Sequence, residues 1–261
     1  MNIFDLKGKT VLFTASGSHL GGAMSEALAC FGANMALTSR NVEKSNAQAN
    51  DFEKRFGGEH IGLALDISDP QSIKKAVNKA AEKFGGIDIL VNNAVHSVTE
   101  MLHEISRERW IEGIDGSING VFNIVREVLP LMMNQKKGNI INIGSMYGMV
   151  PPDYQIYEGT GVSCNPPCYG VGKAGFIQLT KYIACYYAKY GIRANAISPG
   201  PFPAPKVQEN SDFINNLCKK TPAGRIGQPG DLQGIIVLLA SDASSYINGQ
   251  NIAVDGGWTT W

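Results

Sequence analysis

The chain has 261 residues, enough for one large α/β domain with a full hydrophobic core, and we predict a single domain over residues 1–261. Lysines and arginines total 23, as do aspartates and glutamates, so no net charge favours nucleic acid or acidic lipid as a partner. The N-terminus lacks a signal-peptide pattern, and no apolar run reaches the ~18 residues that span a bilayer. We expect a cytoplasmic protein without nucleic-acid or membrane partners, acting on a small molecule.

The five cysteines are an odd number without the spacing of a disulfide scaffold, which fits free thiols in a reducing compartment. Cys164 and Cys168 are close enough in sequence to share a metal ion. The four histidines are scattered, however, and no second cysteine pair completes a tetrahedral site. We therefore predict no metal.

Short apolar runs alternate with helix-length segments along the chain. The runs that predict buried strands are 10–14, 34–38, 61–65, 87–91, 139–143 and 193–197. The amphipathic stretches that predict helices lie near 21–31, 41–56, 70–84, 101–135 and 169–190. This alternation predicts an α/β fold, a doubly wound parallel sheet with right-handed crossovers that place helices on both faces.

Two segments interrupt the alternation. Residues 150–168 are rich in proline, glycine and asparagine, and residues 198–205 contain four prolines, so both are predicted to be loops. Ligands of parallel sheets bind beyond the carboxyl ends of the strands, where both loops must lie. We expect them to shape a substrate site; the alternative is that each is a surface excursion.

A glycine-containing turn follows the first predicted strand, from Thr14 to Gly21, and leads into a helix. Glycine at this place lets the backbone approach a pyrophosphate, which the helix N-terminus binds in Rossmann-type dinucleotide sites. Packing alone also favours glycine in such turns. The second predicted strand ends at Ser39 and Arg40 with no carboxylate, and arginine pairs with the 2′-phosphate of NADP. We predict NADP(H) rather than NAD(H), a solvated arginine being the alternative.

Tyr169 and Lys173 are four residues apart, which places them on one face of a helix. A nearby ammonium favours the phenolate form. We therefore expect the pKa of Tyr169 to be lowered toward the range in which it exchanges protons with a substrate oxygen.

The chain resembles the short-chain dehydrogenase/reductase family over nearly its full length. The matching stretches, in order, are the glycine turn at 14–22, Leu65-Asp66-Ile67, Asn92-Asn93-Ala94, Asn119, Ile143-Gly144-Ser145, Tyr169 with Lys173, Asn195–Gly200 and Val254–Gly257. The resemblance implies an oxidoreductase that transfers a hydride between a nicotinamide cofactor and an alcohol or carbonyl group.

The resemblance also implies a catalytic set. Tyr169 would be the general acid in reduction and the base in oxidation, and Lys173 would lower its pKa and hold the nicotinamide ribose. Ser145 would donate a hydrogen bond to the reacting oxygen, and Asn119 would anchor a water relay to Lys173. The predicted substrate-binding residues are Ser145, Tyr147, Tyr157 and Tyr169.

The implied cofactor contacts cover several strand ends. Asp66 would meet the adenine, Asn92 the adenosine ribose, and the backbone at Pro199 and Gly200 the nicotinamide side. The predicted cofactor-binding residues are Thr14, Ser16, Gly17, His19, Leu20, Gly21, Ser39, Arg40, Asp66, Ile67, Asn92, Ala94, Tyr169, Lys173, Pro199 and Gly200.

The chain departs from the family pattern at the cofactor turn, in the segment after Pro199-Gly200, which lacks the family's usual threonine, and in the interval before Tyr169. Ala15 and His19 stand where the family usually has glycine, which puts cofactor affinity in question. The interval from Ser145 to Tyr169 is longer than is typical, so residues 150–168 include an insertion at the substrate side.

The longer loop and the proline-rich segment resemble a branch of sugar-modifying oxidoreductases, described as flagellin-modification enzymes and gluconate dehydrogenases. This likeness implies a sugar or another small polar carbonyl substrate. A keto-acyl thioester reductase is one alternative, and a catalytically inactive regulatory scaffold, suggested by Ala15 and His19, is another. The family resemblance further implies a homotetramer or homodimer formed through the helices near 101–135 and 169–190.

Overall fold

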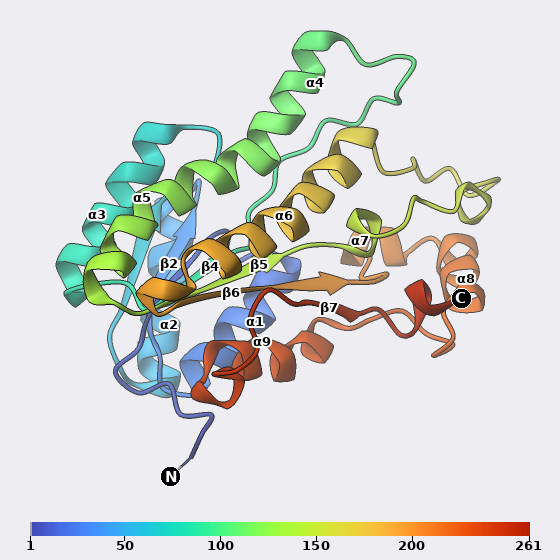
Figure 1. The fold of residues 1–261 in the computed structure, drawn as a ribbon. Helices are drawn as coiled ribbons and strands as arrows, with labels where there is room; N and C mark the ends of the chain where they lie inside the picture. Colours follow the sequence, from blue (N-terminus) through green and yellow to red (C-terminus); the bar gives the residue numbers. More distant parts are fainter. Residues whose placement is uncertain (1) are drawn as a thin grey trace.

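Seven parallel strands form one sheet in the computed structural model, which describes residues 2–261 (Figure 1). Their order across the sheet is β3-β2-β1-β4-β5-β6-β7. The strands are β1 Thr10–Phe13, β2 Asn34–Ser39, β3 His60–Ala64, β4 Ile89–Asn92, β5 Gly138–Ile143, β6 Ile192–Pro199 and β7 Asn251–Val254. The longer helices are α1 His19–Cys30, α2 Val42–Phe56, α3 Pro70–Phe84, α4 Arg107–Ile114, α5 Gly120–Gln135, α6 Pro167–Tyr186, α8 Ser211–Lys220 and α9 Gln233–Ala240. A one-turn helix, α7 Pro205–Gln208, precedes α8.

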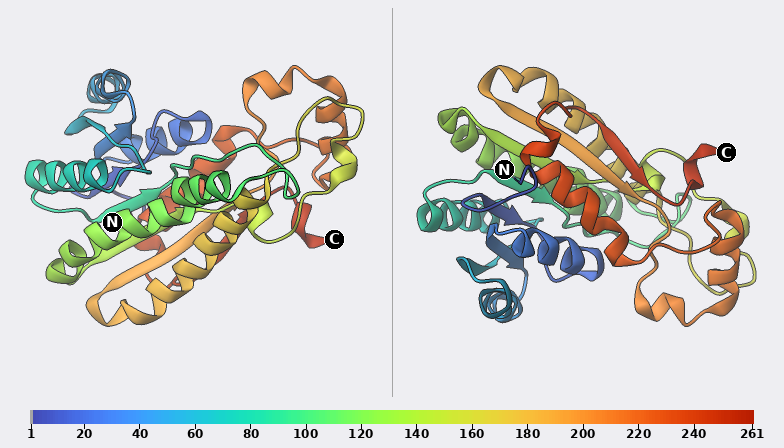
Figure 2. Two further views of the ribbon diagram at one scale, coloured as in Figure 1. Left: turned by 90° about the horizontal axis from the view of Figure 1, so that it is seen from above. Right: turned by 90° about the horizontal axis from the view of Figure 1, so that it is seen from below.

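The central strands are apolar on both faces because helices cover both. Every residue of β1, β4 and β5 is buried. One hydrophobic core lies between the sheet and α3, α5 and α6, and a second lies between the opposite face and α1, α2 and α9. Figure 2 shows these two helical layers from above and below. The predicted fold class is confirmed.

The predicted strands all form, with boundaries shifted by a few residues, and β7 extends the sheet beyond β6. The loop predicted at 198–205 begins later, because Ser198 and Pro199 still pair with β7. The loop predicted at 150–168 ends earlier, because α6 begins at Pro167. The sequence patterns did not predict α8 or α9.

The single helix predicted near 101–135 is wrong. Residues 101–106 form turns, and α4 begins only after Ser106, whose hydroxyl accepts from the N–H of Arg109. A π-helical turn, Asp115–Asn119, then separates α4 from α5. At Gly116 the chain passes so close to His96 that a Cβ would lie 2.7 Å from the His96 carbonyl oxygen. Contacts of this kind between distant segments interrupt the continuous helix that the apolar periodicity of residues 101–135 predicted.

Within residues 2–261, no helix combines the length and apolarity needed to cross a membrane.

At Gly62 on β3 the backbone of α2 lies directly against the sheet. A Cβ added there would lie 2.2 Å from the backbone nitrogen of Asn46. We predict that Gly62→Ala lowers the free energy of unfolding by about 1–3 kcal/mol, because the helix must move outward. Urea denaturation measures this. The matched control is Gly234→Ala on α9, where a Cβ meets no atom within 4 Å and which should be neutral or slightly stabilising. Equal effects of the two substitutions would contradict the prediction.

Candidate active site

A cavity of about 690 Å³ opens at the carboxyl ends of β1, β2, β3 and β4. The predicted cofactor residues in its wall are Gly17, Ser39, Arg40, Asp66, Ile67 and Ala94, and Ala15 lines it beside them. Wall residues that the sequence patterns did not single out include Lys44, Gln48, His96 and Glu112. The place and the residues match a dinucleotide site at the switch point of a doubly wound sheet.

The turn between β1 and α1 leaves backbone donors free. Ser18 caps α1, its hydroxyl accepting from the N–H of Gly21 at 3.2 Å. No acceptor among residues 2–261 is bonded to the N–H of His19 or Leu20. A Cβ at Gly21 would lie 2.4 Å from the Ala15 carbonyl oxygen, so only glycine fits there. Free N–H groups at a helix N-terminus are the usual partners of a pyrophosphate, and the turn therefore fits the cofactor.

Ala15 keeps the backbone shape of the glycine that it replaces. Its φ is 52°, in the left-handed region that costs an L-residue roughly 1–2 kcal/mol. Hydrogen bonds on both sides hold it: its N–H donates to Thr38 Oγ1, and its carbonyl accepts from Ser18 N–H and from Asn93 Nδ2. The alanine strains the turn, but the turn keeps the backbone shape that suits a pyrophosphate.

The predicted residues Thr14 and Ser16 are buried and support the turn from behind. The Thr14 hydroxyl accepts from the backbone N–H groups of Asn93 and Ala94 at 2.8 and 2.9 Å. The Ser16 hydroxyl donates to Gln48 Oε1 at 2.7 Å. Neither side chain faces the cavity. The same holds for His19, whose Nε2 is sealed from solvent and has no partner among residues 2–261.

Two cations stand at the end of β2. Arg40 and Lys44 are exposed and line the cavity together. Asn41 lies between them and caps α2, its side-chain oxygen accepting from Lys44 N–H at 3.0 Å. Sequence analysis did not predict Lys44 as a cofactor residue, because its place beside Arg40 depends on where α2 begins.

Asn92 does not reach the cavity. Its side chain is fully buried and donates to Asn142 Oδ1 at 2.8 Å, and Asn142 in turn donates to Thr180. This chain of hydrogen bonds joins β4, β5 and α6. The side chain of Asn92 therefore stabilises the sheet, whereas sequence analysis predicted that it contacts the adenosine ribose. At the end of β6, Gly200 N–H donates to Val254, which fixes the backbone after Pro199.

Ser145, Tyr169 and Lys173 come together where β5 ends. Ser145 follows β5 by two residues and caps the short turn Met146–Gly148. Its side chain lies beside Tyr169 and acts to lower the pKa of that phenol. Lys173 is 2 % exposed, and its Nζ donates to the Ile143 carbonyl oxygen at 2.6 Å. The same Nζ lies 5.7 Å from the centre of the Tyr169 ring.

The electrostatics differ from the prediction. Burial raises the pKa of Tyr169 above its ordinary value, and the Ser145 side chain beside it offsets this only in part. Burial also lowers the pKa of Lys173 to about 7. The ammonium points at a backbone carbonyl, and desolvation outweighs its attraction for a phenolate. In the cofactor-free protein the phenol therefore keeps its proton at neutral pH.

Asn119 is not part of this cluster. It is exposed at the end of the π-helical turn, and its Nδ2 donates to Asp115 Oδ1 at 2.6 Å. Two other residues of that turn face α6: the hydroxyl of the buried Ser117 would lie 2.6 Å from a Cβ at Gly172, and Ile118 Cγ1 would lie 3.1 Å from a Cβ at Gly175. The π-helical geometry decides which residue faces inward, and the sequence pattern does not reveal it.

The predicted substrate residues Tyr147 and Tyr157 are hydrogen-bonded to each other through their hydroxyl groups. Their hydroxyl oxygens are 2.8 Å apart, and Asn165 Nδ2 donates to the Tyr157 hydroxyl at 3.3 Å. The insertion is also fastened to α8, because Asn216 Nδ2 donates to the Ile156 carbonyl at 3.2 Å. These contacts place the insertion against the turn that carries Ser145.

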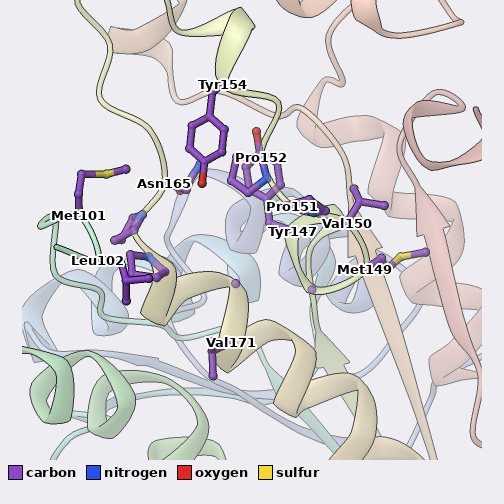
Figure 3. A pocket seen from close by; sticks show the side chains of 14 residues that line it. Met101, Leu102, Tyr147, Met149, Val150, Pro151, Pro152, Tyr154, Asn165 and Val171 are labelled. Atoms are coloured by element: carbon purple, nitrogen blue, oxygen red, sulfur yellow. The ribbon is translucent and has the colours of Figure 1, made fainter.

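A groove of about 330 Å³ lies between the insertion, the first turn of α6 and the segment before α4 (Figure 3). Met101 and Leu102 form one side, and Pro151, Pro152 and Tyr154 form the other. No charged side chain of the described chain lines it.

Comparison with known proteins assigns the chain to a family. The family model described as enoyl-(acyl carrier protein) reductase matches residues 14–259. A 2-dehydro-3-deoxy-D-gluconate 5-dehydrogenase of Dickeya dadantii is 34% identical over 99% of this chain and 98% of its own. A 3-oxoacyl-[acyl-carrier-protein] reductase of Thermotoga maritima is 33% identical over 97% of this chain and 98% of its own.

Among solved structures, a gluconate 5-dehydrogenase from Burkholderia cenocepacia in complex with NADP and tartrate superposes with a TM-score of 0.88. It is 32% identical, over 100% of this chain and 98% of its own. The chain belongs to the short-chain dehydrogenase/reductase family. It is an NAD(P)-dependent oxidoreductase that interconverts alcohol and carbonyl groups.

The buried Lys173 predicts a pH dependence of stability. Its folded pKa of about 7 lies below the ordinary 10.5, so between these values the unfolded chain binds more protons than the folded one. The free energy of unfolding should therefore rise with pH in this window. Relative to Lys173→Met, the cofactor-free wild type should gain on the order of 2 kcal/mol from pH 7 to pH 9. Urea titrations at both pH values test this, and a difference that stays constant would contradict it.

Proposed function

We propose that the chain interconverts the carbonyl and alcohol forms of a small polar, sugar-like substrate, with NADP(H) preferred over NAD(H). The observation that carries this proposal is the convergence of Ser145, Tyr169 and Lys173 at the end of β5. The protonated phenol suits a general acid that delivers a proton to the oxygen of a reduced carbonyl.

The residues then take distinct roles. Ser145 donates a hydrogen bond to the reacting oxygen, and Tyr169 exchanges the proton with it. Lys173, with its pKa near 7, is placed to pass a proton onward and to hold the nicotinamide ribose. A nicotinamide cofactor held in the cavity would supply or accept the hydride. The free N–H groups of His19 and Leu20 would hold the pyrophosphate.

Polar groups at the insertion favour a hydroxylated substrate. Tyr147, Tyr157 and Asn165 form a hydrogen-bonded set whose free donor and acceptor positions suit hydroxyl groups. The similarity to sugar-acid dehydrogenases agrees with this. The apolar groove beside Met101 and Leu102 instead favours the second candidate, a 3-oxoacyl thioester reductase. This chain is similar in sequence to such an enzyme from Thermotoga maritima.

We also propose that residues 1–261 act as a single domain, assembled into a homotetramer or homodimer in the cytoplasm. Phe122 on α5 and Tyr182 and Tyr186 on α6 are about half exposed, at 50%, 57% and 52%. Large apolar side chains exposed in this way on neighbouring helices suit a subunit contact. The five cysteines are free, which suits a reducing compartment.

The two cations Arg40 and Lys44, which line the cavity together, predict a preference for NADPH over NADH. We expect Arg40→Ala and Lys44→Ala each to raise the Kd for NADPH about tenfold, because each removes a charged partner of the 2′-phosphate. The Kd for NADH should stay within about twofold, since NADH lacks that phosphate. Titration of nicotinamide fluorescence measures both. Lys54→Ala, at an exposed lysine elsewhere on α2, is the control. Parallel losses for NADPH and NADH would argue against a phosphate contact.

Tyr169→Phe tests the proton transfer. The substitution keeps the ring but removes the hydroxyl, so turnover should fall by about 10²–10⁴-fold while NADPH still binds. Steady-state rates and fluorescence titration separate the two effects. An unchanged rate would refute the role of Tyr169, and a wild type that binds neither nicotinamide would favour the inactive regulatory scaffold.

A further inference from the structure

The phenol of Tyr169 belongs to a set of weak acids that carry no charge. It interacts with the phenols of Tyr147 and Tyr157, and these two interact with the thiol of Cys164. Burial is the largest cause that raises the pKa of each, and of Tyr169 itself, above its ordinary value. All four therefore stay protonated and neutral at physiological pH. The remaining groups that act on them, Ser145 and Asn165, are neutral as well.

The cation of this region does not face the same space. Lys173 donates to the Ile143 carbonyl from a side chain that is 2 % exposed. Its ammonium is 4.5 Å from the centre of the Phe176 ring, within the core under α6. One of its donors is taken by that carbonyl, and in the proposed reaction another holds the nicotinamide ribose. Lys173 does not line the groove beside the insertion, so it is not placed to pair with an anion on the substrate.

Cations on the surrounding loops are neutralised by carboxylates. Lys220 on α8 pairs with Asp153 of the insertion at 3.0 Å. Arg225 binds Asp231 through two hydrogen bonds of 2.6 and 3.1 Å. The first pair joins α8 to the insertion and the second joins two segments that precede α9, so each of these cations is already balanced by a carboxylate.

The remaining cations near the insertion lie at the surface. Arg107, Lys206 and Lys219 are exposed and contribute to none of the cavities described above. An anionic group next to the reacting carbon would thus lose its hydration on binding and would gain no positively charged partner. Hydroxyl groups in the same place would find the phenols and the Asn165 amide as hydrogen-bond partners.

We propose that the site selects substrates that carry no charge on the reacting carbonyl or on the carbons bonded to it, such as a ketose flanked by hydroxylated carbons. This inference rests on the proposed function and narrows its substrate class. It disfavours 2-oxo acids. A carboxylate or phosphate at the far end of a longer substrate lies outside its scope.

Dihydroxyacetone and hydroxypyruvate provide a matched pair of probes. They differ only in that one hydroxymethyl group beside the carbonyl is replaced by a carboxylate. With NADPH, we expect kcat/KM for dihydroxyacetone to exceed that for hydroxypyruvate by at least about tenfold, because burial of an unpaired carboxylate is penalised. Equal or better reduction of hydroxypyruvate would overturn the proposal.

A charge introduced at Asn165 should reverse the discrimination. Asn165 Nδ2 already contacts the Tyr157 hydroxyl, so Asn165→Lys places an ammonium beside the reacting region. We expect the ratio of kcat/KM values to shift toward hydroxypyruvate by about tenfold. Asn165→Gln, which lengthens the side chain but keeps the neutral amide, should leave the ratio close to that of the wild type. An equal shift in both variants would show that size decides selectivity and would contradict the proposal.

Binding separates this inference from the proposed reaction. If the wild type reduces neither probe, the proposed function fails for these compounds, and ligand-observed NMR in the presence of NADP⁺ then decides the question of charge. Binding of dihydroxyacetone with at least tenfold weaker binding of hydroxypyruvate would support the neutral site. Comparable binding of hydroxypyruvate, or binding of neither probe, would overturn it.

Discussion

A buried ammonium needs an acceptor, and Lys173 finds one in the carbonyl of Ile143, the last residue of β5. This bond ties α6 to the strand that leads into Ser145. It therefore fixes the helix that carries Tyr169 against the turn that carries Ser145. The same burial brings the pKa of Lys173 to about 7 and raises that of Tyr169. The burial of Lys173 and Tyr169 thus determines both where the two side chains lie and how strongly each holds its proton.

The features that sequence predicted well are those fixed by local patterns. Alternating apolar runs predicted the strands, and the turn before Gly21 predicted a cradle whose tight geometry the structure shows. Ala15 keeps the left-handed backbone despite its methyl group, because hydrogen bonds on both sides hold it. A residue that departs from a family pattern can therefore preserve the function of the turn while adding strain.

The features that sequence missed depend on contacts between distant segments. Asn119 is exposed and Ser117 is buried because a π-helical turn rotates the chain between α4 and α5. The side chain of Asn92 is hydrogen-bonded to Asn142, 50 residues later, and does not line the cavity. The pKa of Tyr169 rises because burial outweighs the nearby lysine, and burial is a property of the folded chain. Motif matching supplies residue types, whereas orientation comes from packing.

Transfer of a hydride between nicotinamide and a carbonyl carbon is the central claim, and isotope transfer tests it most directly. The protein would be incubated with NADPH carrying two deuterium atoms at C4 and with dihydroxyacetone, and the glycerol formed would be analysed by mass spectrometry. We expect one deuterium on the central carbon of glycerol for each cofactor oxidised. Glycerol without deuterium, or cofactor left unoxidised in the presence of several ketoses, would contradict the claim.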